Sequence, residues 1–155
     1  QLTDSNCALA GRWLRVFHDL SNANGSKNKF LFGDFSISHL YIDINGLSIT
    51  AIDPGAGFGT IGKPESDIAR FVVSLLQSRT LKIWLISSYV SAFMHAYGVQ
   101  NIDKLTLDDE IKYRVHRNFN KRITLRSGVK NYFRARAVFV NSLVKSYWIA
   151  KIINL

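Results

Sequence analysis

The 155-residue chain has a single cysteine, Cys7, so it cannot form an internal disulfide bond. This excludes the disulfide framework of small secreted domains. A catalytic thiol is also not favoured, because no neighbouring residue singles out Cys7 as activated. The first residues lack the basic and then apolar pattern of a signal peptide. We therefore expect a cytoplasmic protein, and because the chain begins with Gln1 we expect it to be a piece of a longer one.

Acidic residues are scarce, and the last part of the chain has none. The chain carries 20 Lys and Arg against 11 Asp and Glu, a net charge of +9. Eleven basic residues and no acidic one lie between Ile111 and Leu155: Lys112, Arg114, Arg117, Lys121, Arg122, Arg126, Lys130, Arg134, Arg136, Lys145 and Lys151. Such a block attracts anions, such as an acidic small molecule, an anionic membrane surface or nucleic acid.

Aromatic residues interleave with this basic block, at Tyr113, Phe119, Tyr132 and Phe133. Aromatic side chains on nucleic-acid-binding proteins serve as platforms on which bases stack. At this spacing, however, we expect them to belong to the core. Nucleic acid is therefore not the favoured partner, and a membrane surface stays among the candidates.

Charged side chains are also missing between Ile83 and Ile102, a length that invites a transmembrane interpretation. Polar residues such as Ser87, Ser91 and Gln100 make this run too polar to cross a bilayer. We expect a buried central helix instead, with His95 as a core or rim residue, and no transmembrane segment.

The composition, with 47% apolar and 20% charged residues, is that of one globular domain. Apolar spacing and capping residues predict five helices. They begin at Asp4 or Ser5, at Pro64 or Ser66, at Leu81, at Thr106 and at about Val129. A polar loop with Gly25 is expected over 21–29.

A β-hairpin is strongly predicted between Gly33 and Pro54, because Asn45-Gly46 is a typical two-residue hairpin turn. A turn of this length pairs Ile44 with Leu47. It then follows that Ile42 faces Ile49, Leu40 faces Ala51 and His39 faces Ile52. One face of the ribbon is apolar and the other is polar.

The hairpin should bring Asp34, His39 and Asp53 together. Directly opposed residues in an antiparallel pair lie roughly 4.5–5.5 Å apart, so His39 must lie beside the residue that precedes Asp53. The segment from Asp34 to Ser38 covers the same end of the ribbon. Two carboxylates and an imidazole are therefore expected to converge.

These residues resemble the aminoglycoside phosphotransferase and choline kinase family, relatives of the protein kinases. The family has a catalytic loop H-G-D-x-x-x-x-N, a hairpin with an I-D metal turn, and a helix opening D-[IL]-A. The matching segments here are Phe32 to His39, Ile52-Asp53-Pro54-Gly55 and Asp67-Ile68-Ala69, and the helix 8–18 resembles the one that precedes the loop. The resemblance covers residues 8–76 and implies a mostly helical α+β fold, the C-terminal lobe of a kinase. In this interpretation residues 1–155 form one lobe, with the catalytic loop and metal turn within 30–62 and a helical remainder over 63–155.

The resemblance implies a role for each residue of the motif. Asp34 would be the base that accepts the proton of an acceptor hydroxyl, and Asp53 would bind Mg²⁺. Ser36 and His39 would contact the ATP cofactor, with His39 as a second metal ligand. Gly33 would support the loop, and Asp67 would brace it by accepting backbone hydrogen bonds. The N-terminal lobe that covers the nucleotide is not supplied by the residues before Phe30, so this fragment is expected to be inactive alone.

The chain departs from the family at two positions. His39 replaces an asparagine, and imidazole is a less typical ligand for Mg²⁺ than an amide oxygen. Phe32 replaces a histidine that packs the loop, which is a milder change. A further motif, Gly57-Phe58-Gly59-Thr60-Ile61-Gly62, spells the dinucleotide-binding fingerprint, but it follows half of an antiparallel hairpin rather than a parallel strand.

The acceptor is expected to be neutral or anionic. Aminoglycosides are polycations that require carboxylates, whereas only four acidic residues lie beyond Asp67. A small molecule with a hydroxyl group, such as a sugar, fits better. Two alternatives stay open: a pseudokinase in which His39 marks lost metal binding, and a basic anion-binding module without catalysis.

Overall fold

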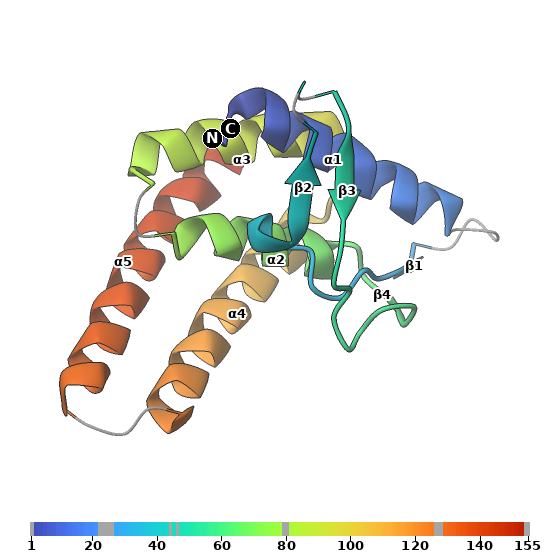
Figure 1. Ribbon diagram of the computed structural model, residues 1–155. Helices are drawn as coiled ribbons and strands as arrows, with labels where there is room; N and C mark the ends of the chain where they lie inside the picture. Colours follow the sequence, from blue (N-terminus) through green and yellow to red (C-terminus); the bar gives the residue numbers. More distant parts are fainter. Residues whose placement is uncertain are drawn as a thin grey trace.

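The computed structural model describes residues 2–21, 27–43, 45, 47–78, 81–125 and 129–153. It is mostly helical with a small amount of antiparallel sheet, as the sequence predicted. Its helices are α1 (Asp4–Leu20), α2 (Glu65–Leu76), α3 (Ile83–Tyr97), α4 (Lys104–Leu125) and α5 (Val129–Ile153), with short 3-10 turns η1 (Ile37–His39) and η2 (Val99–Asn101). Figure 1 shows α1 and α3 side by side above α2, with α4 and α5 extending away from them.

Helix α1 begins one residue earlier than its acidic residues suggested. Thr3 is the N-cap, and its hydroxyl accepts a hydrogen bond from the Asn6 backbone while the Asn6 side chain accepts one from Thr3. This reciprocal pair satisfies two free N–H groups of the first turn. The helix then packs along α3 at Gly11, where an added Cβ would collide with the Phe93 carbonyl oxygen. Only glycine allows this close crossing.

The core lies between α1, α2 and α3 and is rich in stacked aromatic rings. Phe71 of α2 stacks on Phe93 of α3 with ring centroids 4.2 Å apart, and Phe35 of the loop packs against both. Trp13 of α1 stacks on the other side of Phe35. Burying side chains of this size contributes roughly 1.5–3 kcal/mol each. The loop that carries Asp34 is therefore anchored through Phe35 into the centre of the domain.

The hairpin forms in the register that the sequence predicted. Strands β2 (Leu40–Ile42) and β3 (Ile49–Ala51) pair antiparallel, with Leu40 opposite Ala51 and Ile42 opposite Ile49. Ile52 donates its backbone N–H to the His39 carbonyl at 2.9 Å, which continues the pairing by one step. The predicted contact between Ile44 and Leu47, and the Gly46 position of the turn, lie outside the described residues.

A second strand pair was missed. Strand β1 (Lys29–Phe30) pairs antiparallel with β4 (Ile61–Gly62), although no strand was expected between the hairpin and α2. Two residues are too few to show a period-2 pattern in the sequence. The pair places the Gly57–Gly62 motif in an antiparallel setting, as the sequence predicted in setting aside a dinucleotide site. In the described part of the chain no parallel strand pair is present.

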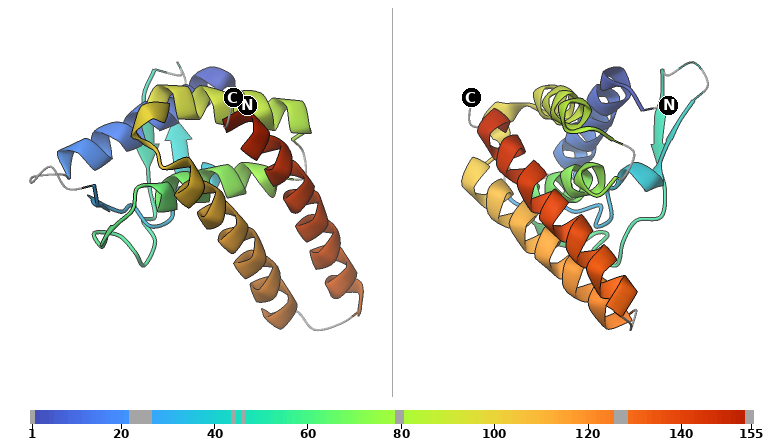
Figure 2. Two further views of the ribbon diagram at one scale, coloured as in Figure 1. Left: turned by 180° about the vertical axis from the view of Figure 1, so that it is seen from behind. Right: turned by 90° about the vertical axis from the view of Figure 1, so that its left-hand side faces the viewer.

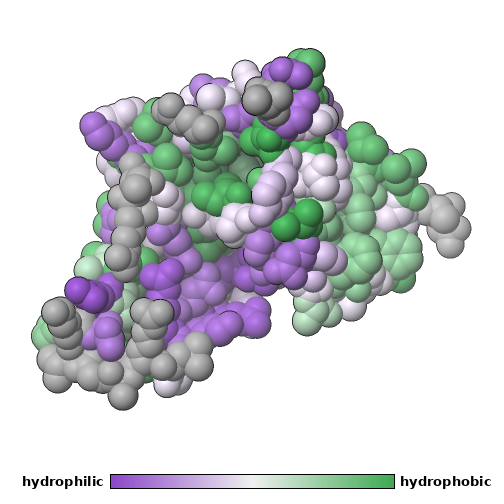
Figure 3. Space-filling view, viewed as in Figure 1, coloured by the Kyte–Doolittle hydropathy of each residue, from purple (hydrophilic) through white to green (hydrophobic). Residues whose placement is uncertain are grey.

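Helices α4 and α5 form a long antiparallel pair that projects from the core (Figure 2). Helix α4 begins before the expected Thr106, because Asp103 caps it by accepting hydrogen bonds from Leu105 and Thr106. In Figure 3, hydrophilic side chains gather across α2 and the first half of α4, whereas apolar ones cover the end that carries β1 and β4. None of the described helices is long and apolar enough to cross a membrane.

Two expectations about burial were wrong. Helix α3 is not buried on all sides: Phe93 and Tyr97 face the core, but Trp84 and His95 are exposed. The sequence of α3 misled because its surface is apolar or uncharged. The aromatic residues of the basic block also differ from expectation, since Tyr113, Tyr132 and Phe133 are exposed and only Phe119 is stacked, on Phe139.

Candidate functional site

The loop between β1 and β2 owes its shape to two glycines. Gly33 adopts φ +90°, a left-handed conformation that side chains disfavour. Gly55, after the hairpin, packs so closely that an added Cβ would lie 2.9 Å from both the backbone nitrogen and the Cβ of Asp34. The two ends of the hairpin segment are thereby in van der Waals contact, and Asp34 is held beside the turn that follows Asp53.

Asp67, in the first turn of α2, braces this loop. Its Oδ2 accepts a hydrogen bond of 2.6 Å from the Phe32 backbone, and its Oδ1 accepts one of 2.9 Å from the Gly33 backbone. The side chain is only 1% exposed. Hydrogen bonds to an ionised acceptor are roughly twice as strong as neutral ones. The hydrogen bonds expected of Asp67 are present, and they fix the two residues that precede Asp34.

His18 and Tyr97 extend this brace into α1 and α3. His18 Nε2 lies 3.2 Å from Asp67 Oδ2, and His18 Nδ1 lies 2.9 Å from the Tyr97 hydroxyl. Burial raises the pKa of Tyr97 well above its usual range, so the phenol keeps its proton and can donate it to Nδ1. Nε2 then donates to the carboxylate. Three helices are tied to the loop through one buried chain of hydrogen bonds.

Arg70, one turn after Asp67, holds Asp34 from the other side. Arg70 Nε lies 3.2 Å from Asp34 Oδ1, and the guanidinium also donates to the Gly33 carbonyl at 3.3 Å. The sequence suggested only that Arg70 might find an acidic neighbour. The pair leaves Asp34 Oδ2 without a cation of that kind, and Oδ2 is the oxygen 3.9 Å from His39 Nδ1.

His39 lies between the two carboxylates, as the hairpin register predicted. Its Nδ1 is 3.1 Å from the Asp34 backbone carbonyl, and its Nε2 is 3.7 Å from Asp53 Oδ2. A carbonyl oxygen can only accept, so this hydrogen bond places a proton on Nδ1. In the neutral ring Nε2 then keeps its lone pair, directed to the side on which Asp53 lies. His39 and Asp53 together present one nitrogen and two oxygen donors.

Asp53 has an unusual backbone. Its φ of +52° is the only positive value at a described residue other than glycine, and its side chain is 77% exposed. A residue in this region costs of order 1 kcal/mol or more and persists only where its surroundings require it. Such strain in an exposed aspartate is typical of a functional position. The strained turn directs Asp53 to His39 instead of pairing it with a cation.

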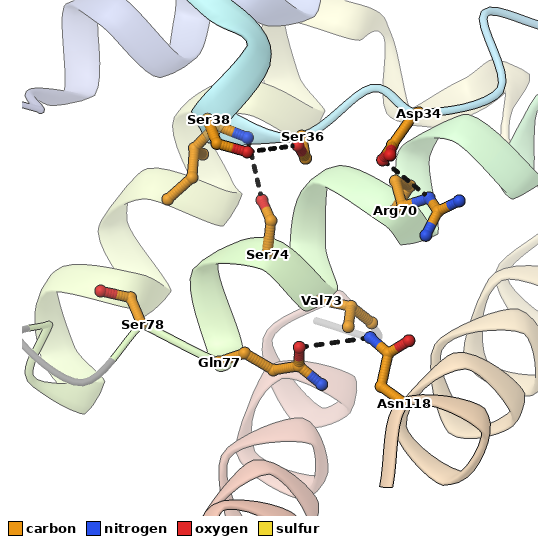
Figure 4. Close-up of a pocket in the computed structure, with 10 residues that line it drawn as sticks. Asp34, Ser36, Ser38, Arg70, Val73, Ser74, Gln77, Ser78 and Asn118 are labelled. Carbon is orange, nitrogen blue, oxygen red and sulfur yellow. Dashed lines mark hydrogen bonds and ion pairs between the residues drawn. The ribbon is translucent and has the colours of Figure 1, made fainter. Parts of the chain in front are cut away.

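A cleft of about 360 Å³ opens beside Asp34. Figure 4 shows Asp34 and Arg70 at one end, the serines of the loop and of α2 along the wall, and Gln77 with Asn118 of α4 at the other end. Ser36 Oγ and Ser38 Oγ lie 2.9 Å apart, and Ser74 Oγ accepts the Ile37 backbone N–H at 3.2 Å. Asp34 and Arg70 are the only charged residues in the described lining, and they pair. The cleft is polar and close to neutral.

The site residues found from the sequence fall into two groups. Asp34, His39 and Asp53 lie together, with Gly33 and Asp67 behind them, whereas Ser36 is buried in the cleft wall. Sequence reasoning missed His18, Tyr97, Gln77 and Asn118. His18 sits at the end of an amphipathic helix and Asn118 in a basic block, and neither position has a local pattern that indicates its partner.

No group of three or more His, Cys, Asp or Glu side chains forms a closed metal cluster in the described ranges. Comparison with protein-family models, with curated proteins and with solved structures gave no match. The functional argument therefore depends on the site itself.

Proposed function

We propose that this chain is the C-terminal lobe of a small-molecule kinase of the aminoglycoside phosphotransferase and choline kinase type. The observation that carries the proposal is the cluster of Asp34, His39 and Asp53 on a loop that Asp67 braces. Phosphoryl transfer needs little more from a protein than positioning and charge neutralisation. An N-terminal lobe would cover the ATP, and a cytoplasmic location would supply it.

Asp34 would accept the proton of the acceptor hydroxyl. Its carboxylate stands at the end of the polar cleft, and Arg70 fixes one of its oxygens at 3.2 Å. The other oxygen is free of that ion pair and would receive the proton. Holding base and hydroxyl in one geometry lowers the barrier because the entropy of their encounter is removed in advance.

The donors of Asp53 and His39 fit a divalent ion such as Mg²⁺. Their closest atoms are 3.7 Å apart, which allows both to approach one ion, and the exposed Asp53 leaves room for nucleotide oxygens. A bound ion would neutralise the charge on the transferred phosphate. The imidazole of His39 is a softer ligand than amide oxygen, which favours Mn²⁺ relative to Mg²⁺ at this position.

The acceptor would be a neutral compound with several hydroxyl groups, such as a sugar. The cleft wall is made of serine hydroxyls and the amides of Gln77 and Asn118, and the only carboxylate, Asp34, is paired with Arg70. Hydroxyls and amides both donate and accept, which suits a polyhydroxyl ligand. A polycation would find no free carboxylate here except the base itself.

The test is an assay of phosphate transfer from ATP in the complete natural polypeptide. Asp34→Asn should lower the transfer rate by roughly 10²–10⁴-fold without changing the melting temperature, because it removes the base but keeps the shape. Asp108→Asn, an exposed carboxylate of α4, is the matched control and should leave the rate unchanged. Undiminished transfer by Asp34→Asn would contradict the proposal.

Nucleotide binding separates the kinase from a pseudokinase. Asp53→Asn should weaken ATP affinity in Mg²⁺ but not in EDTA, whereas His39→Asn should keep the affinity and shift preference from Mn²⁺ to Mg²⁺. Calorimetry in each metal would measure both effects. ATP affinity that is equally weak with and without metal would instead support a catalytically silent pseudokinase.

A further inference from the structure

Helix α5 has its faces reversed relative to an ordinary surface helix. Its inward side carries small or polar residues such as Ala135, Ser142 and Ser146, all buried. Its outward side carries large apolar ones, which we call the α5 stripe: Phe133, Val140, Val144, Tyr147 and Trp148. Their spacing of three, four and seven residues places them on one side of the helix. The most apolar side of α5 therefore faces away from the core.

The α5 stripe is open to solvent. Phe133 and Tyr147 are each 61% exposed and Trp148 is 52% exposed. The right-hand view of Figure 2 looks onto α5 along its length, with no described helix or strand in front of it. Contiguous exposed apolar side chains of this size mark an interaction surface. Scattered single residues would need no such explanation, but these form a continuous stripe.

Basic side chains border the stripe. Arg134 and Arg136 are exposed beside Phe133, and Lys151 Nζ lies 5.0 Å from the Tyr147 ring and 5.5 Å from the Trp148 ring. No acidic residue occurs between Ile111 and Leu155 to offset them. The surface thus combines apolar rings with uncompensated positive charge. Its complement is a surface that is apolar inside and negatively charged outside.

We propose that the outer face of α5 binds an anionic membrane surface and lies flat in its headgroup region. Tyr and Trp rings suit this depth because each has an apolar body and a polar tip. Lysine and arginine reach from the same helix to the lipid phosphates with their apolar stems along the rings. This inference does not depend on the proposed kinase function, because the cleft and the cluster around Asp34 are built from other elements.

Two other occupants fit less well. A second copy of the chain would bring the same basic border against itself in a symmetric pair, and like charges facing each other oppose association. A spanning orientation does not agree with α5, since none of the described helices is long and apolar enough to cross a membrane. An anionic lipid surface satisfies both the rings and the charges.

Co-sedimentation with lipid vesicles tests the proposal. The chain should bind vesicles of phosphatidylcholine with phosphatidylserine and should bind those of phosphatidylcholine alone much more weakly. The triple variant Phe133→Ser, Tyr147→Ser, Trp148→Ser should lower binding by roughly tenfold or more. Neutralising Arg134 and Arg136 to Gln should weaken it about fivefold for each charge.

Matched controls come from other faces. Tyr41→Ser with Leu105→Ser removes exposed apolar side chains away from α5, and Arg12→Gln with Lys104→Gln removes exposed charges; both should bind as the parent does. Circular dichroism should give one melting temperature for all variants. The proposal is overturned if the triple variant binds unchanged, if neutral vesicles bind equally, if no binding occurs at low salt, or if light scattering finds a dimer that the triple variant dissolves.

Discussion

The two sides of the loop around Asp34 use their carboxylates in opposite ways. On the buried side, Asp67 is 1% exposed and its oxygens are taken by two backbone N–H groups and by His18. On the open side, Asp53 is 77% exposed and has only His39 beside it. The buried carboxylate shapes the loop, and the open one stays available to a ligand. The same residue type therefore serves stability on one side and chemistry on the other.

The most severe way to break this contrast is Asp67→Ala. The change leaves two backbone donors and His18 without their acceptor in a buried site, so we expect a loss of about 3–5 kcal/mol in the free energy of unfolding. Denaturant titration would measure it. Asp53→Ala is the matched control on the open side and should cost less than about 1 kcal/mol. Similar losses for both variants would remove the distinction.

Gly55→Ala tests the contact that holds the two ends of the hairpin segment together. Its Cβ would lie 2.9 Å from the Asp34 backbone nitrogen, so we expect a destabilisation of about 1–3 kcal/mol. Gly57→Ala is the control, because a Cβ there would meet its nearest atom at an ordinary 3.6 Å. Thermal melts of both variants would show the difference, and an unperturbed Gly55→Ala would mean that the loop yields easily.

A smaller effect is expected from Cys7, which reports on the core behind the loop. Burial, and to a lesser degree Asp4, raises the pKa of Cys7 from 9.0 to about 12. The folded state resists ionisation of the thiol more than the unfolded state does. Stability from this group is complete below about pH 9 and falls as pH rises toward 12. Between pH 8 and pH 10 the parent should lose about 1 kcal/mol more than Cys7→Ala, and parallel losses would show that the thiol is accessible.

The smallest change is expected from Asp53→Gly. Glycine adopts a positive φ without strain, so stability should rise by at most about 1 kcal/mol or stay unchanged. Affinity for metal-bound nucleotide should fall in the complete polypeptide, since a carboxylate is lost. Urea titration and calorimetry would separate the two readouts. A clear destabilisation would show that the Asp53 side chain supports the fold.

Local patterns made the hairpin predictable. Asn45 beside a glycine sets the register, and the register alone places His39 near Asp53. The antiparallel setting of the glycine motif followed from the same hairpin. By contrast, the partnership of His18, Asp67 and Tyr97 depends on how α1, α2 and α3 pack, and their sequence separations of 49 and 79 residues leave no local signal. The kinase assignment and the roles of Asp34 and Asp53 stay proposals.

The exposed aromatics of the basic block show where pattern reasoning reaches its limit. Periodicity identifies which residues share a helix face, but it does not say which face meets the core. In α5 the core side is small and polar, at Ser142 and Ser146, so the usual rule gives the wrong orientation. Tyr132 and Phe133 were therefore expected inside and lie outside.

The chain from Tyr97 through His18 to Asp67 has a consequence for how the domain opens. Because one carboxylate joins the loop to three helices, the amides of Phe32 and Gly33 cannot exchange with solvent unless the helices separate. The loop that carries Asp34 thus belongs to the same cooperative unit as the core and does not open as an independent flap. A catalytic group carried on such a loop keeps its position until the domain itself unfolds.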